Sequence, residues 1–118
     1  MKKHTVSYKV HDVVVVPFPF TDRESSKRRP ALVLSDANNF NAQVGQSVLA
    51  MITSAANSCW PLDVEISDLN AAGLTSSSVV RMKLFTLDHQ LILRKAGTLS
   101  ESDSRQVDLT VRQLLLFF

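Results

Sequence analysis

Two groups of cationic side chains have the chemistry to bind phosphate. One is the Lys-Arg-Arg triplet at residues 27–29, immediately before Pro30, and the other is Arg81 with Lys83. A guanidinium presents a fork of N–H donors that matches two phosphate oxygens, and it stays protonated at neutral pH. Both groups are therefore candidates to bind an anionic ligand, although a basic triplet is more commonly part of a solvated loop.

Residue types that hold metals are sparse. The histidines at positions 4, 11 and 89 lack the spacing of a metal cluster, so each is expected at the surface or in a hydrogen bond. The single cysteine, Cys59, cannot alone form an intrachain disulfide or a thiolate metal site. We expect no metal and no cofactor.

Three aromatic side chains have two interpretations each. Phe18 and Phe20 are able to stack on unpaired bases, but alternating aromatics at a strand end more often belong to a core. Trp60 stands next to Pro61 and near a polar loop, so it fits either an interface or core packing. The sequence leaves these alternatives open.

The composition predicts one small domain. A chain of 118 residues, 45% hydrophobic and 20% charged, supports one core, so we expect a single domain over residues 1–118 whose first eight residues are disordered. A net charge of +2 does not by itself indicate a nucleic-acid-binding protein. The apolar stretch at 13–20 is too short for a bilayer, and no signal-peptide pattern follows Met1, so we expect a cytoplasmic protein without a membrane partner.

Apolar runs predict the strands. β-branched and aliphatic residues predict central strands over 13–16, 31–34 and 47–52, and alternation predicts a half-buried strand over 62–66. Over 79–84, Val80, Met82 and Leu84 are expected on one face, with Arg81 and Lys83 on the other. Residues 91–98 predict one more short strand. Residues 21–26 predict a loop that carries the basic triplet, with Pro17 and Pro19 preventing regular pairing beside it.

A helix is expected at the C-terminal end. Ser100, with Asp103 three positions later, resembles a capping box. An apolar stripe of helical period follows, made of Val107, Val111, Leu114, Leu115 and Phe118. About five strands and this helix predict a mainly β fold of the α+β class, a strongly curved antiparallel sheet or barrel closed by a helix.

Segments along nearly the whole chain resemble one family. They are DVV at 12–14, PFPF at 17–20, RPALVLS at 29–35, ITS at 52–54, and VVR at 79–81 followed by TLD at 86–88. In this order and spacing, they resemble the PemK/MazF/Kid toxins of type II toxin–antitoxin systems. The resemblance covers about residues 9–118.

The resemblance implies a fold, an activity and partners. It implies a small SH3-like barrel, usually a homodimer, that cleaves single-stranded RNA at a short sequence without a metal ion and that binds a cognate antitoxin. Cleavage of mRNA would inhibit translation and growth. The catalytic pair of the family falls on Arg29 and Thr53. We expect the substrate to be bound by Arg81, Phe20, Arg28, Ser54 and Lys83.

This sequence departs from the family at three places. His11 stands where glycine is usual before the first strand, so a different path into that strand is expected. Lys83 stands where some members have an acidic residue, which removes any mechanism that needs that carboxylate. No histidine lies between Phe20 and Arg29 to carry a proton.

RNA cleavage without a metal can use the ribose 2′-hydroxyl as an internal nucleophile, so the protein must position the substrate and stabilise charge. Arg29 would stabilise the charge of the transition state. Thr53 would donate its hydroxyl to a phosphate oxygen or orient the 2′-hydroxyl, a contribution commonly of about 2–4 kcal/mol. Arg81 would be a second phosphate ligand or would contact a base.

Each of these residues also has a simpler interpretation. Arg29 fits a solvated loop cation, Thr53 fits a turn with Ser54, and Arg81 fits an ion pair with Asp63 or Glu65. Two rival functions remain: a toxin on the same barrel that traps gyrase, and a catalytically silent RNA-binding regulatory module. The cleaved RNA motif, the antitoxin and the dimer interface stay open.

Overall fold

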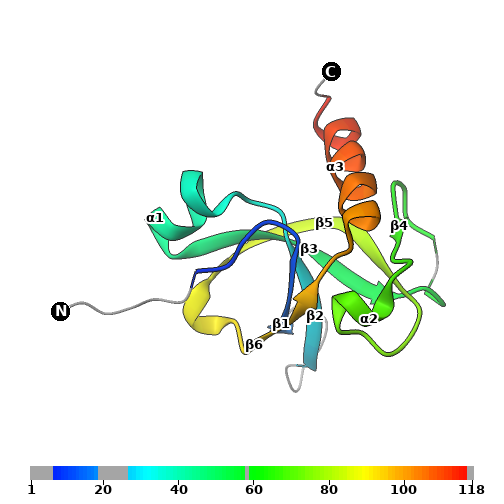
Figure 1. Cartoon of the computed structure of the whole chain (residues 1–118), viewed down its shortest axis with the longest axis horizontal. Coiled ribbons are helices and arrows are strands. Elements are labelled where there is room, and N and C mark those ends of the chain that lie inside the picture. Colours follow the sequence, from blue (N-terminus) through cyan, green and yellow to red (C-terminus); the bar gives the residue numbers. More distant parts are fainter. Residues whose placement is uncertain (1–6, 19–26, 58, 117–118) are drawn as a thin grey trace.

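The computed structural model describes residues 7–18, 27–57 and 59–116, and its centre is one antiparallel sheet of six strands in the order β4-β5-β3-β2-β1-β6 (Figure 1). The strands are β1 (Asp12–Phe18), β2 (Lys27–Val33), β3 (Gln46–Ser54), β4 (Val64–Glu65), β5 (Ser78–Asp88) and β6 (Arg94–Thr98). The helical segments are η2 (Ala37–Asn41), α1 (Ala42–Val44), α2 (Leu69–Ala72), η3 (His89–Leu91) and α3 (Glu101–Leu115). This strongly curved sheet with its C-terminal helix confirms the predicted fold class.

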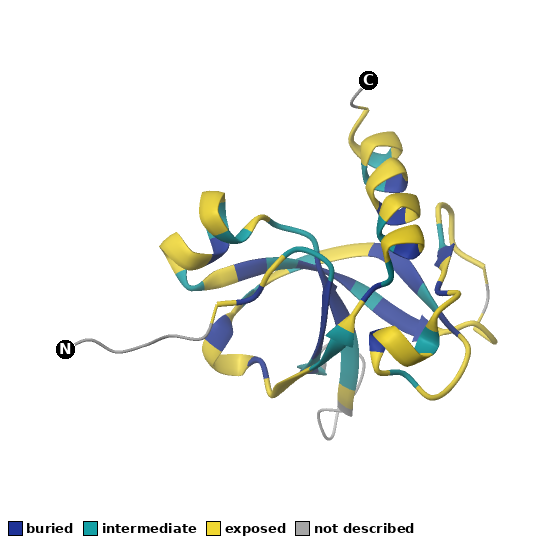
Figure 2. Ribbon diagram, in the orientation of Figure 1, coloured by how far each residue is buried: buried dark blue, intermediate teal, exposed yellow. Residues whose placement is uncertain are grey.

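Both faces of the sheet carry apolar clusters, because successive side chains of a strand point to opposite faces. On β1, Val13 belongs to one cluster and Val14 to the other. The first cluster lies under α2 and α3 and includes Leu32, Ile52, Val80 and Val107. The second includes Val16, Ala31, Leu49 and Ile92. Figure 2 shows the buried residues concentrated along the central strands.

Helix α3 begins as predicted. The Ser100 hydroxyl accepts a hydrogen bond of 3.1 Å from the backbone N–H of Asp103. Val107 is fully buried, and Val111 and Leu114 pack against the same cluster. Leu115 does not join the stripe, since it is 50% exposed in the last turn, and Phe118 lies outside the described residues.

Strand β1 continues in regular pairing through Pro17, where the sequence predicted that pairing would stop. Pro17 pairs with Arg28 and Phe18 pairs with Lys27, so the basic triplet lies inside β2 rather than in a loop. Beyond Val15, β1 pairs with β2 alone among the described strands. Pro17 is tolerated there because the strand has no described partner on its other side that would need a backbone N–H from this residue. Pro19 and residues 21–26 lie outside the described residues.

A bulge interrupts the pairing of β5 with β3. Ala50 is opposite Leu84 while Met51 is opposite Arg81, so β5 holds two extra residues at this point. Val80 and Met82 are buried as predicted, but Leu84 is 39% exposed. Because the insertion is of two residues, Val80 and Leu84 stay on the same face, opposite Ile52 and Ala50, and Leu84 differs from the prediction only in its exposure.

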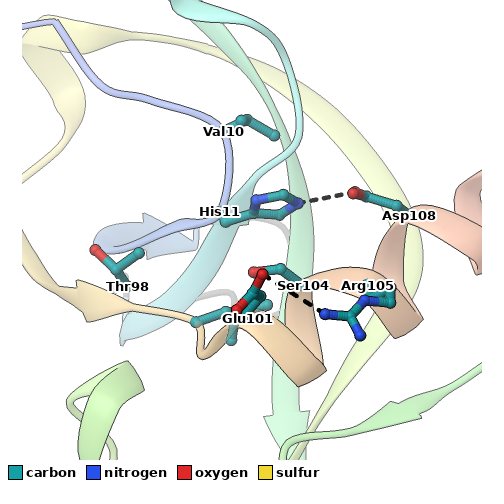
Figure 3. Close-up of a pocket in the computed structure, with 8 residues that line it drawn as sticks. Val10, His11, Thr98, Glu101, Ser104, Arg105 and Asp108 are labelled. Carbon is teal, nitrogen blue, oxygen red and sulfur yellow. Dashed lines mark hydrogen bonds and ion pairs between the residues drawn. The ribbon is translucent and has the colours of Figure 1, made fainter.

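The turn into β1 keeps the backbone conformation that glycine would adopt. His11 has φ of 76°, in the left-handed region that favours glycine. The chain therefore enters β1 in the conformation that glycine would adopt, and the expected different path is not seen. Its ring Nε2 lies 2.8 Å from Oδ1 of Asp108 on α3 (Figure 3). The left-handed conformation costs a residue with a Cβ atom about 1–2 kcal/mol.

Tyr8 is packed into the fold although it lies in the segment expected to be disordered. Tyr8 is buried, and its ring meets the ring of His89 edge to face at 5.2 Å, so the expected disorder of residues 1–8 does not extend to Tyr8. Residues 1–6 lie outside the described part of the chain.

His89 is buried and hydrogen-bonded to the Ser47 hydroxyl at 2.8 Å, which confirms the prediction of a hydrogen-bonded histidine. No helix among the described residues is long and apolar enough to span a membrane.

Candidate functional site

The structure brings Arg29 and Thr53 together at one end of the sheet. Ala31 on β2 is opposite Met51 on β3, and this register continued by two residues places Arg29 opposite Thr53. Both residues line one cleft of about 240 Å³, together with Pro30 and Ser54. Two residues that are distant in the sequence therefore share one face and one cleft.

Thr53 is held with its hydroxyl oriented. The residue is only 6% exposed, and its Oγ1 accepts a hydrogen bond of 2.7 Å from Nδ2 of Asn57. A hydroxyl that accepts from an amide keeps its own proton available for donation. Ser54 is exposed, and its Oγ accepts from the backbone N–H of Ala56 at 3.1 Å, so the expected turn engages Ser54 and not Thr53.

Arg29 carries a buried donor without a partner. Its Nε is the one buried side-chain nitrogen or oxygen in the described part of the chain that makes no hydrogen bond. An unsatisfied buried polar group costs about 1–3 kcal/mol, and more when it is charged. Such a donor in a cleft, next to an oriented hydroxyl, is suited to an anionic ligand.

A second groove of about 420 Å³ continues from the cleft and shares Arg29 and Pro30 with it. Arg28 and Arg94, both exposed, line this groove. Arg94 on β6 is opposite Val15 of β1, which in turn is opposite Pro30 of β2, so three neighbouring strands form the floor. The sequence analysis missed Arg94, whose only signal was its place at the start of a short strand.

The far wall of the cleft is the segment 74–76, which follows α2. Close backbone contact holds this segment in place. A Cβ at Gly97 on β6 would lie 2.4 Å from the carbonyl oxygen of Ala71, and Gly73 has φ of +74°. Gly97 lets α2 approach β6 closely, and Gly73 lets the chain turn sharply from α2 into the segment 74–76.

Arg81 and Lys83 lie beside the cleft and do not line it. Arg81 is 8% exposed and binds Asp63 with two hydrogen bonds, Nε to Oδ1 at 3.1 Å and Nη2 to Oδ2 at 2.9 Å. The hydrogen bond to Asp63 raises the pKa of Arg81 above its usual range. The ion pair with Asp63 is confirmed, and the contact of Arg81 with substrate stays a prediction. The exposed Lys83 lies over the ring of Trp60, which is 41% exposed and therefore not a core residue.

Other candidate positions are less informative. Phe20 lies outside the described residues. A larger hollow of about 510 Å³ lies between His11 and α3, as Figure 3 shows, and it contains neither Arg29 nor Thr53. Its polar side chains already contact each other: His11 with Asp108, and Arg105 with Glu101 at 3.6 Å. We therefore place the candidate site at Arg29 and Thr53.

Comparison with known proteins identifies the family. The model of the PemK-like, MazF-like toxins of type II toxin-antitoxin systems matches residues 9–115. The chain belongs to this toxin family. The match confirms the resemblance of the motifs along the sequence. No curated protein matches the chain by sequence.

Solved structures are similar over nearly the whole chain. MazF of Deinococcus radiodurans is 25% identical with a TM-score of 0.71, and the match covers 94% of this chain and 98% of that one. An endoribonuclease from Mycobacterial species, solved with its cognate antitoxin, is 12% identical with a TM-score of 0.75 over 97% and 98% of the two chains. The Mycobacterium tuberculosis toxin MazF-mt6 is 18% identical with a TM-score of 0.71 over 91% and 98%. The last two likenesses show the fold alone.

Proposed function

We propose that this toxin is a metal-independent endoribonuclease that cleaves single-stranded RNA, mRNA above all, with Arg29 and Thr53 as its catalytic residues. The observation that supports this most is the unpartnered Nε of Arg29 in the same cleft as the oriented hydroxyl of Thr53. A structurally similar protein is described as an endoribonuclease, which agrees with the proposal. Cleavage of mRNA would stop translation and growth.

The reaction begins with attack of the ribose 2′-oxygen on the adjacent phosphorus. A bond from O2′ to phosphorus forms, the bond to O5′ breaks, and the products are a 2′,3′-cyclic phosphate and a 5′-hydroxyl. The 2′-hydroxyl loses its proton to solvent, and the leaving oxygen gains one from solvent. Arg29 stays protonated and stabilises the added negative charge, while Thr53 donates its hydroxyl to a phosphate oxygen.

The remaining cations bind the RNA chain around the cleft. Arg28 and Arg94 line the groove that continues from Arg29, so they would contact phosphates on that side. Ser54 and Lys83 would contact the substrate on the other side of Thr53. Phe20 is proposed as a further contact on the strength of the family motif alone.

A cognate antitoxin and a second copy of the chain complete the proposal. Complexes with MazE have been solved for MazF of Deinococcus radiodurans. An acidic or amphipathic segment would complement the exposed arginines of the groove and cover the cleft. The homodimer is proposed from the family.

The test separates cleavage from its rivals. Purified protein, free of antitoxin, is incubated with long structureless RNA in excess EDTA, and in parallel with gyrase and supercoiled DNA. Fragments with 2′,3′-cyclic phosphate ends and normal gyrase activity are the expected result. Intact RNA with inhibited gyrase would instead identify a gyrase-trapping toxin, and intact but bound RNA would identify a silent binding module.

A further inference from the structure

Residues 60–63 form a closed turn that holds an aromatic ring at the surface. The backbone N–H of Trp60 donates to Oδ2 of Asp63 at 3.2 Å, and the N–H of Asp63 donates to the carbonyl oxygen of Trp60 at 3.2 Å. Leu62, between them, has φ of 67°. Trp60 is 41% exposed, so it is fixed in position without being buried.

A buried cation anchors this turn to the sheet. The two hydrogen bonds from Arg81 hold both carboxylate oxygens of Asp63, and Arg81 itself is 8% exposed on β5. The guanidinium carbon of Arg81 lies 5.7 Å from the centre of the Trp60 ring. Arg81 and Asp63 are thus positioning residues for Trp60.

A second cation lies on the ring. Nζ of Lys83 is 4.6 Å from the ring centre, and Lys83 is exposed. Within the described ranges, no carboxylate lies at ion-pair distance from Lys83. A surface aromatic ring together with an exposed, mobile lysine is a combination that single-strand-binding proteins use to stack a base and bind its phosphate, once the lysine side chain moves off the ring.

This turn lies close to the proposed catalytic residues. Val79 on β5 is opposite Thr53, and Arg81, two residues further along β5, is opposite Met51. Two residues of a strand span about 7 Å. The anchor of the turn is therefore on the same part of the sheet as Thr53.

We propose that Trp60 and Lys83 form a nucleotide subsite for single-stranded RNA, in which a base stacks on the indole ring and Lys83 binds a phosphate. The subsite rests on the proposed function. It assigns substrate binding to a residue for which the sequence left an interface and core packing as alternatives. The charge on Lys83 favours a nucleic acid over an apolar protein surface as the occupant.

The single tryptophan of the chain makes the subsite directly observable, since intrinsic tryptophan emission comes from Trp60 alone. Thr53→Ala protein, which should bind RNA without consuming it, is titrated with a structureless RNA of mixed sequence. We expect saturable quenching of the emission, shifted to higher RNA concentration by Lys83→Gln. Arg112→Gln removes another exposed charge, on α3, and should leave the titration unchanged.

Affinity of the same labelled RNA, measured by anisotropy, provides the second readout. Trp60→Ala should weaken binding about 5- to 150-fold, while Trp60→Phe, which keeps an aromatic ring, should retain most of the affinity. The thermal unfolding midpoint of each variant checks that the variant is folded. We expect both variants to be folded because Trp60 is exposed.

The outcomes separate this proposal from the proposed function. Cleavage by the parent protein without any change of Trp60 emission on RNA binding would overturn the subsite and leave the ribonuclease standing. Quenching in Thr53→Ala together with no cleavage by the parent protein would support the subsite and overturn the ribonuclease. Emission that changes with protein concentration or with an acidic peptide, but not with RNA, would show that Trp60 binds protein and would overturn the subsite.

Discussion

Asn57 donates a hydrogen bond of 2.7 Å from Nδ2 to Oγ1 of Thr53, four residues earlier in the chain. The amide occupies an acceptor position of the hydroxyl and so leaves the proton of Thr53 free to point into the cleft. Asn57 is exposed, while Thr53 is buried. A surface residue therefore orients a buried hydroxyl.

Asn57→Ala should lower kcat for RNA cleavage by about 2- to 10-fold, the effect of one neutral hydrogen bond of about 0.5–1.5 kcal/mol. Stability should hardly change, because the side chain is at the surface. Single-turnover cleavage rates check this, with Asn70→Ala on α2 as a control at another exposed asparagine. An unchanged rate in Asn57→Ala would show that the hydroxyl needs no orientation.

Arg94→Gln should weaken RNA binding uniformly across RNA sequences, because a phosphate contact carries no base information. The slope of log affinity against log salt concentration should fall by about 1. Binding titrations at several salt concentrations measure it. Arg112→Gln, on α3 and outside the groove, should keep the parent slope. An equal change in both variants would mean that the groove has no special role.

His11 should be replaced by glycine more easily than by alanine. Alanine keeps the left-handed strain and loses the contact with Asp108, whereas glycine loses the contact but adopts φ of 76° without strain. His11→Gly should therefore be more stable than His11→Ala by about 1–2 kcal/mol, measured by urea unfolding. Equal stabilities of the two variants would argue against strain at this position.

Asp103 ties α3 to the segment before α2. Burial opposes its charge, but the hydrogen bonds from the backbone of Asp68 and from Ser67 outweigh burial and hold the pKa of Asp103 below its ordinary value of 3.8. Its carboxylate accepts from the N–H groups of Ser67 and Asp68 at 3.1 and 3.0 Å and from the Ser67 hydroxyl at 2.7 Å. A carboxyl whose pKa is lowered by folding stabilises the protein above its unfolded pKa.

This stabilisation is lost as the pH falls from 3.8, the ordinary pKa, through the lower folded pKa. Asp103→Asn should be less stable at neutral pH by about 1.5–3 kcal/mol, the range for hydrogen bonds to a charged group. Its free energy of unfolding should also depend less on pH below 4 than that of the parent. Urea unfolding over this pH range measures both effects, and Glu65→Gln, at an exposed carboxylate on β4, is the control. Parallel curves for Asp103→Asn and the parent would contradict the assignment.

Local patterns in the sequence were sufficient for the strands and the final helix. The β-branched run before Pro17, the apolar segment after Pro30 and the Ser100 cap all depend on neighbours in sequence, and each lies in the predicted element. The helical segments at 37–44 and 69–72 were not predicted. They are short, and their Asp36 and Asp68 caps resemble ordinary turns in sequence.

The site was predictable only through the family. Arg29 and Thr53 are 24 positions apart, and only strand register brings them into one cleft. The ion pair of Arg81 was among the predicted alternatives, but the bulge in β5 beside Arg81 depends on the pairing of β5 with β3. Asn57 and Arg94 reach the site through turn geometry and sheet order, which local sequence patterns do not contain.

The rate of RNA cleavage in excess EDTA, compared among the parent, Arg29→Ala, Thr53→Ala and the double variant, tests the central claim most directly. We predict discrete cuts by the parent with 2′,3′-cyclic phosphate ends. We also predict rates about 10²- to 10³-fold lower in each single variant. The double variant should lose little more, because residues that act as a unit are not additive. Folded single variants that cleave at the parent rate would contradict the assignment of Arg29 and Thr53.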